Sequence, residues 1–247
     1  MIDNSDEPNP VFDLLQDRNW ERALKEAKKS PKLCKELYHA QGFYDGQISS
    51  RVNALHMASA VGAPPEVIQG LAAFNPGAAF QVDRKYGRIP LQIAVMTGAS
   101  AATVGALLKI DTKTAREKDN NGRVALHYAC KDPVGGESST RLLLRAYPEG
   151  AMVADDSGFL PLHVACRYGT SLSVIRMLIR AAPESMLRKT KKGSTPMVCA
   201  KTSKGGLGEE IVGILERCAE ESLDRTNETK RRLGADGVHQ EGSEASQ

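Results

Sequence analysis

The sequence predicts an all-α fold in which short helical repeats stack into a solenoid. The first observation is a short phrase that recurs five times, each time around an apolar anchor. The anchors are Leu55, Leu91, Leu126, Leu162 and Met197. Successive anchors lie 36, 35, 36 and 35 residues apart. Such a period is typical of a solenoid, in which each unit buries its apolar face by stacking on its neighbours.

The second observation is a turn before each recurrence of the phrase. Glycines stand four residues before four of the anchors, where a tight turn needs a positive φ. They are Gly87, Gly122, Gly158 and Gly193. Aspartates that can accept local backbone N–H bonds precede the first three of these turns. They are Asp83, Asp119 and Asp155.

The third observation is the order of helix signals within each unit. The anchor lies in a first helix, and an apolar run at helical spacing then predicts a second helix. Glycines end the first helices seven residues after three anchors, at Gly62, Gly98 and Gly169. Prolines stop the second helices 21 or 22 residues after three anchors, at Pro76, Pro148 and Pro183.

The recurring phrase resembles the ankyrin signature Thr-Pro-Leu-His-x-Ala. Ala125-Leu126-His127-Tyr128-Ala129 and Pro161-Leu162-His163-Val164-Ala165 are two of its five copies. The resemblance implies five helix–turn–helix–loop repeats over residues 54–221, joined by finger loops. It also implies a non-catalytic module that binds a protein or peptide through its concave face and its finger loops.

The two ends of the chain follow the repeat pattern less closely. We expect a disordered N-terminus over residues 1–8, and then a helical cap over residues 9–53 with helices at Val11–Gln16 and Trp20–Lys29. An insert over residues 32–52 carries Tyr38, Phe43 and Tyr44, which either bind a partner or pack against the first repeats. From residue 222 to 247 the chain loses apolar residues, which predicts a disordered tail.

Composition narrows the classes of function. The 247 residues are 41% hydrophobic and carry a formal net charge of +3, which alone does not favour nucleic acid as a partner. The sequence lacks an apolar run of membrane-spanning length, and its polar start does not resemble a secretory signal. Its five cysteines show no disulfide spacing, which predicts reduced thiols. We therefore expect a cytoplasmic or nuclear monomer without a membrane contact.

The resemblance implies that a partner contacts the finger tips and the exposed side of the first helices. The positions that match are Arg84, Lys85, Tyr86, Arg88, Met96, Asn120, Asn121, Arg123, Lys131, Asp132, Asp156, Phe159, Arg167, Tyr168, Lys191 and Lys192. Because this strip is mostly basic, an acidic or phosphorylated segment is the partner that we expect. Phe159 and Tyr168 are the candidate anchors. Alternatively, Phe159 packs against the adjacent finger.

The sequence also offers residues for two functions other than protein binding. The basic loop at residues 188–192, together with Lys230–Arg232, favours a nuclear or nucleic-acid-associated adaptor. The pairs His127/Cys130 and His163/Cys166 have the residue types of a zinc site or a thiol enzyme. The resemblance instead implies that these histidines bond to backbone. Since no catalytic or phosphate-binding motif is present, we expect neither an enzyme nor a cofactor.

Two connections depart from the repeat. In the third repeat, the segment Lys131–Gly136 stands where other repeats have a helix-ending glycine. Because it contains a proline and glycines, we expect a protruding, mobile loop there. The glycine-rich stretch Lys204–Gly208 precedes the last helix. It either lets the last repeat turn or holds an anion.

Overall fold

The computed structural model describes residues 9–44, 46, 48–132, 136–203 and 206–221. The predicted disordered segments at 1–8 and 222–247, with Lys230–Arg232, lie outside these residues. So do Pro133–Gly135, at the centre of the predicted mobile loop, and Lys204 with Gly205.

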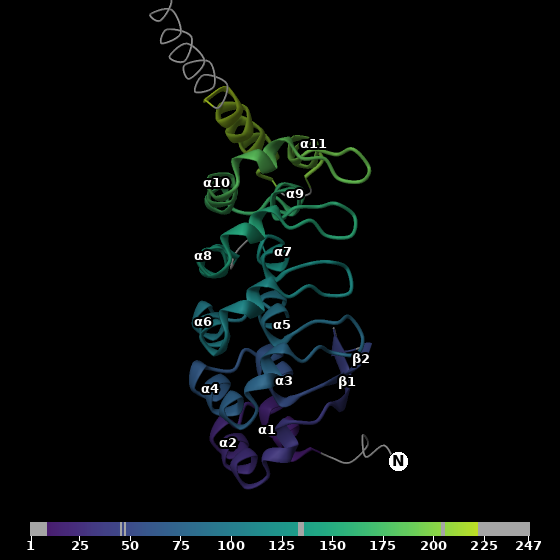
Figure 1. Ribbon diagram of the computed structural model, residues 1–247, viewed down its shortest axis with the longest axis vertical. Coiled ribbons are helices and arrows are strands. Elements are labelled where there is room, and N and C mark those ends of the chain that lie inside the picture. The colour runs from purple at the N-terminus through teal and green to yellow at the C-terminus, as the bar shows by residue number, and fades with distance from the viewer. Residues whose placement is uncertain (1–8, 45, 47, 133–135, 204–205, 222–247) are drawn as a thin grey trace, which may run out of the picture.

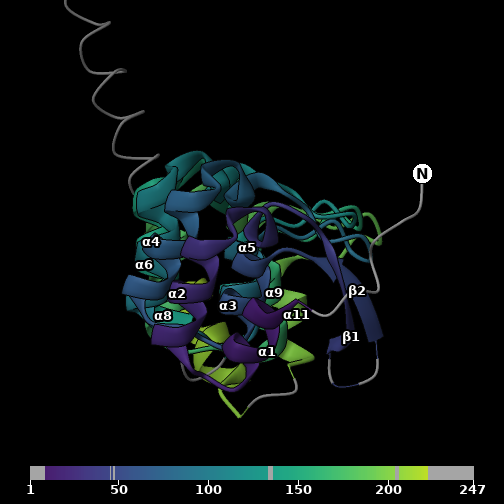
Figure 2. The ribbon, with the colours of Figure 1, turned by 90° about the horizontal axis from the view of Figure 1, so that it is seen from below.

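The described part of the chain is mostly helical, and its helices form pairs that stack one on another (Figure 1). The pairs are α1 (Pro10–Gln16) with α2 (Trp20–Lys29), α3 (Ala54–Ala60) with α4 (Pro65–Phe74), α5 (Pro90–Met96) with α6 (Ala101–Ile110), α7 (Ala125–Ala129) with α8 (Gly136–Ala146), α9 (Pro161–Tyr168) with α10 (Leu172–Ala181), and α11 (Pro196–Lys201) with a helix at residues 208–221. Figure 2 shows that the first helices lie between the second helices on one side and the finger loops on the other.

The anchors lie in the core between successive first helices. Leu55, Leu91, Leu126 and Leu162 are at most 2% exposed, whereas Met197 in the last pair is half-buried. Each first helix contacts the first helix of the next pair, so every anchor is enclosed by neighbouring repeats. Since a five- to eight-residue helix is marginal by itself, this packing supplies most of its stability.

Each second helix ends two residues before the predicted proline, and the proline then opens a short 3-10 helix. These are η2 (Pro76–Phe80), η4 (Pro148–Met152) and η5 (Pro183–Leu187); η3 (Thr112–Arg116) occupies the same place without a proline. The residue before the proline has nearly the same backbone conformation in every case, with φ and ψ of −149° and 83° at Asn75 and −149° and 81° at Ala182. Ser30, before η1 (Pro31–Cys34), is similar at −132° and 77°. The N-terminal helices therefore follow the backbone plan of the later pairs.

The aromatic insert is an exception within the mostly helical fold, because it forms two strands. β1 (Tyr38–Tyr44) pairs antiparallel with β2 (Ile48–Val52), and Tyr38 lies opposite Val52. Burial alternates along β1 from Tyr38 to Gln41, as expected for a strand with one face covered. The hairpin stands beside the finger loops (Figure 1). Each finger is numbered by the anchor that follows it, and β2 accepts a hydrogen bond from the second finger, which precedes Leu91.

Two of the three aromatic rings in the insert pack against their neighbours. Tyr38 is 7% exposed and its ring centroid lies 5.5 Å from that of Phe12 in α1. Tyr44 is 5% exposed and its ring lies edge-on to Tyr86 at 4.9 Å. Phe43 is half-buried beside Tyr44. Of the two alternatives for the insert, this burial supports packing.

Three finger loops are each closed by an aspartate of their own. Asp83 accepts three backbone N–H bonds within its finger, at 2.8–3.0 Å. Asp119 and Asp155 each accept two at 2.9 Å in the same way. Although burial raises the pKa of a carboxyl, these donors hold the pKa of Asp83 below its ordinary value. The predicted turn chemistry is confirmed.

Backbone hydrogen bonds join each finger to the next. They run from the N–H group of Arg84 to the carbonyl of Arg51, from Asn120 to Tyr86, from Asp156 to Asn121, and from Lys191 to Ser157, over 2.9–3.2 Å. The fingers thus form one continuous row that begins at the hairpin.

One side chain of each first helix ties that helix to the following finger. His56, Gln92, His127 and His163 each accept a bond from the backbone N–H group at the start of their own helix. Their other polar atom lies 2.9–3.1 Å from a carbonyl of the next finger. In α11 the equivalent residue is Val198, which is 47% exposed and has no polar atom to offer.

Two glycine substitutions, at Gly158 and Gly193, test whether adjacent fingers pack against each other. Gly158 and Gly193 both have φ of +80°, so alanine is strained equally at both, by about 1–2 kcal/mol. At Gly158 a Cβ atom would also lie 2.8 Å from the backbone nitrogen of Lys191, whereas at Gly193 it meets no described atom within 4 Å. We expect Gly158→Ala to lower the urea midpoint more than Gly193→Ala, by the equivalent of a further ~1–3 kcal/mol. Equal losses would mean that adjacent fingers are not packed together.

Candidate functional site

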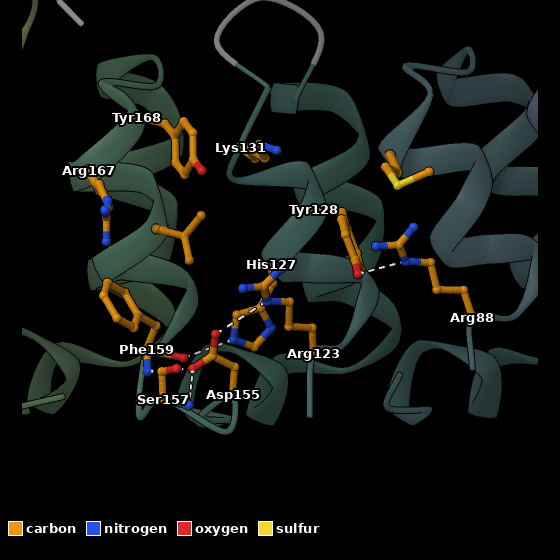
Figure 3. A pocket seen from close by; sticks show the side chains of 12 residues that line it. Arg88, Arg123, His127, Tyr128, Lys131, Asp155, Ser157, Phe159, Arg167 and Tyr168 are labelled. Atoms are coloured by element: carbon orange, nitrogen blue, oxygen red, sulfur yellow. Dashed lines mark hydrogen bonds and ion pairs between the residues drawn. The ribbon is translucent and has the colours of Figure 1, made fainter. Parts of the chain in front are cut away.

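A hollow of about 280 Å³ lies between α7 and α9 on the side of the finger loops and extends to α5 (Figure 3). Its lining combines four cationic side chains with three aromatic rings. The lining residues are Arg88, Met96, Arg123, His127, Tyr128, Lys131, Asp155, Ser157, Phe159, Val164, Arg167 and Tyr168. These side chains come from three repeats, so only the folded stack brings them together.

A second hollow adjoins the first on the side of α5. It is lined by Met96, Thr97, Gly98, Tyr128, Lys131 and Asp132. Met96, Tyr128 and Lys131 line both hollows, so the two lie side by side. The combined depression is called the groove below, and it runs across α5, α7 and α9.

Arg88 is held on the floor of the groove by a cluster of tyrosines. Its Nε donates to the hydroxyl of Tyr128 at 3.0 Å and lies 3.8 Å from Asp119, and the Tyr128 hydroxyl donates to Asp119. The guanidinium carbon lies 4.3 Å from the ring centre of Tyr86 and 5.1 Å from that of Tyr44. Burial and the bond to Asp119 raise the pKa of Tyr128 to about 12, so its hydroxyl stays protonated at neutral pH. This cluster joins the hairpin, two fingers and α7.

Arg123 forms an ion pair with Asp155 of the fourth finger. Its Nε lies 3.3 Å from Oδ2 of Asp155, whose Oδ1 accepts the backbone N–H groups of Ser157 and Phe159. Both oxygens of Asp155 are therefore occupied. Asp155 is the one carboxylate that lines the first hollow.

The remaining two cations of the hollow lie over aromatic rings. The Lys131 ammonium lies 5.5 Å from the ring centre of Tyr168, and the Arg167 guanidinium lies 5.6 Å from that of Phe159. Phe159 also lies edge-on to His163, 5.9 Å away in the same repeat. Phe159 is half-buried by these contacts, while Tyr168 is 39% exposed.

The family model described as ankyrin repeats (3 copies) matches residues 55–149. Residues 55–149 of the chain therefore consist of ankyrin repeats. The match spans the first three anchors, and the bond from His163 to the fifth finger repeats the same geometry beyond it. A search of curated proteins found no match to the chain. Among the helices of the described residues, none is long and apolar enough to cross a membrane.

Eight of the sixteen predicted contact residues line the groove. They are Arg88, Met96, Arg123, Lys131, Asp132, Phe159, Arg167 and Tyr168. Seven others lie exposed on the finger loops, namely Arg84, Lys85, Asn120, Asn121, Asp156, Lys191 and Lys192. Tyr86 is half-buried against Arg88.

Four residues that line the first hollow were missed in the sequence, and helical spacing could have found two of them. Tyr128 lies one turn before Lys131, and Val164 lies one turn before Arg167, so each pair shares a helix face. His127 was assigned to the helix start and Asp155 to the finger turn, whereas Ser157 was placed on the exposed finger surface. That they also border the groove follows only from the stacking of adjacent repeats.

The histidine and cysteine pairs are structural. Both ring nitrogens of His127 and of His163 contact backbone atoms, which leaves neither nitrogen free for a metal. Cys130 and Cys166 are fully buried, and burial raises the pKa of both thiols, which makes them unreactive. The described residues contain no group of three or more metal-ligating side chains. The predicted bonding of these histidines to backbone is confirmed.

Proposed function

We propose that this ankyrin repeat protein binds a protein or peptide partner through its concave face, with the groove at the centre of the contact and the finger tips at its rim. Ankyrin repeats in general are protein-interaction modules. The observation that carries the proposal is the concentration of Tyr128, Phe159 and Tyr168 with four cations in one depression. Tyrosine and arginine are enriched at the centres of protein interfaces.

The stack also suits recognition because its contact residues are held before a partner arrives. Arg88 and Arg123 have fixed hydrogen-bond partners, and rings fix the positions of Lys131 and Arg167. A pre-ordered surface loses little conformational entropy on binding. The partner that fits is acidic or phosphorylated, because the first hollow is lined by four cations and one carboxylate. We propose a monomer in the cytoplasm or nucleus, where buried free thiols remain reduced.

A second candidate function uses the fifth finger. Arg188, Lys189, Lys191 and Lys192 are all exposed, and Thr190 stands where the earlier fingers have an aspartate. This finger therefore carries its positive charge without an internal carboxylate, which favours contact with nucleic acid. Because residues 188–195 include no aromatic side chain for base stacking, we rank this function second.

One capture experiment separates the two functions. Wild-type protein, a Phe159→Ala/Tyr168→Ala variant and a Lys189→Gln/Lys191→Gln/Lys192→Gln variant are used to capture partners from lysate, with and without nuclease. We expect protein partners that survive nuclease and whose recovery falls at least about tenfold only with the first variant, as hot-spot removal predicts. Circular dichroism checks that both variants remain folded. Recovery that falls only with the second variant or with nuclease would favour nucleic acid instead.

A further inference from the structure

The four cations of the groove differ in what already neutralises them. Arg88 is hydrogen-bonded to Tyr128 beside Asp119, and its side chain is only 11% exposed. Arg123 is paired with Asp155 at 3.3 Å. Both guanidinium groups thus have a carboxylate close by inside the protein. Their first role is to hold the fingers and α7 in place.

Lys131 and Arg167 are placed differently. Both are exposed, and no carboxylate of the described residues lies within ion-pair distance of either. Each instead lies over a ring, Tyr168 for Lys131 and Phe159 for Arg167. A ring attracts a cation through its quadrupole but carries no net charge, so these two cations retain their charge for a partner.

Between these cations the groove offers an apolar wall. Tyr128, Phe159, Val164 and Tyr168 line the first hollow, and Tyr168 is 39% exposed. The hollow of about 280 Å³ is at the lower limit of small-molecule sites, which occupy about 300–1,000 Å³. A hollow of this size and openness to the surface suits one large side chain of a partner.

The separation of Lys131 and Arg167 favours carboxylates over phosphate. Figure 3 shows them on opposite sides of the Tyr168 ring. A phosphate is recognised by donors that converge on one group, whereas two separated single charges fit two carboxylates.

We infer that the groove binds a segment in which one large apolar side chain is flanked on both sides by Asp or Glu. The apolar side chain enters the hollow beside Tyr128 and Tyr168, and the flanking carboxylates pair with Lys131 and Arg167. This inference rests on the proposed function, since it names the chemistry of the partner for the same groove.

Selection of random peptides displayed on phage tests the inference. The full chain is the bait, and a Lys131→Gln/Arg167→Gln variant is selected in parallel. The matched control is Lys109→Gln/Arg180→Gln, which removes the same charge from α6 and α10. Wild type should enrich peptides with acidic residues on both sides of a Leu, Ile, Met, Phe or Trp. The selected peptide should bind the groove variant at least about tenfold more weakly and the control variant equally well.

A double-mutant comparison assigns the contacts. Replacing the peptide's flanking Glu with Gln should weaken binding to wild type but add little loss on the Lys131→Gln/Arg167→Gln background. Replacing that Glu with phosphoserine should not strengthen binding, and a gain of about tenfold or more would overturn the choice of carboxylate. A selected motif without acidic residues that still depends on Phe159 and Tyr168 would overturn the inference and leave the proposed function standing. If no selected peptide depends on any groove residue, the proposed function fails as well.

Discussion

Replacing Leu162 with alanine is expected to lower the free energy of unfolding by about 2–5 kcal/mol. Leu162 has 0% exposure and lies in α9, which packs against both α7 and α11. Truncation removes buried methyl groups and leaves a cavity that the flanking helices cannot close, because their own anchors hold them. Urea denaturation followed by circular dichroism measures the change.

Leu187→Ala is the control for this experiment. Leu187 has the same side chain but is 78% exposed at the end of η5, so its truncation should shift the midpoint by no more than about 0.5 kcal/mol. Similar losses for both variants would show that Leu162 is not enclosed between repeats, which would contradict the stacking described above.

Acid is expected to destabilise the stack through its buried histidines. Burial lowers the pKa of His56 to about 4 and also lowers the pKa values of His127 and His163. The unfolded chain binds a proton on each histidine near pH 6.5, whereas the folded chain resists protonation until lower pH. Stability is therefore full above pH 6.5 and falls towards pH 4. His56 alone accounts for a loss of about 3 kcal/mol by pH 4.

Gln92 shows how to remove this sensitivity without removing the contacts. Its Oε1 accepts the backbone N–H group of Ile89 at 3.0 Å, and its Nε2 donates to the carbonyl of Arg123 at 2.9 Å. Since glutamine does not titrate, changing His56, His127 and His163 together to Gln should largely flatten the stability profile from pH 7 to pH 4.

The control is the exposed His39 on β1. Urea midpoints measured across this pH range should show that His39→Gln keeps the acid sensitivity of the wild type. A triple variant as acid-sensitive as the wild type would place the cause in other groups.

The repeat could be predicted from sequence because its signals are local. The turn glycines, the finger aspartates and the helix-stopping prolines act within a few residues of their own position, and each has the predicted role. The hairpin carried a local signal as well, because an Asp45-Gly46 pair is typical of a hairpin turn, but the sequence analysis predicted only an aromatic insert at this place.

The groove could be predicted only in part because its contacts are long-range. Arg88 and Tyr128 are 40 residues apart, and their hydrogen bond depends on how one repeat is rotated against the next. The same applies to Arg123 and Asp155, 32 residues apart. Sequence identified three of these four as surface or turn residues, but it did not show that Arg88 and Arg123 are already neutralised inside the protein.

The row of bonded fingers implies that the two ends of the repeat array differ in how readily they unfold. At the hairpin end the first bond is made to a strand that is itself paired. At the other end a Cβ atom on Gly193 would meet no described atom within 4 Å, and Val198 has no polar side-chain atom with which to bond a further finger. In a one-dimensional array each unit is held by its nearest neighbours, so a unit with one neighbour opens first. Unfolding should thus proceed from the fifth finger towards the hairpin, and α9, which borders the groove, lies one unit inside the end that opens.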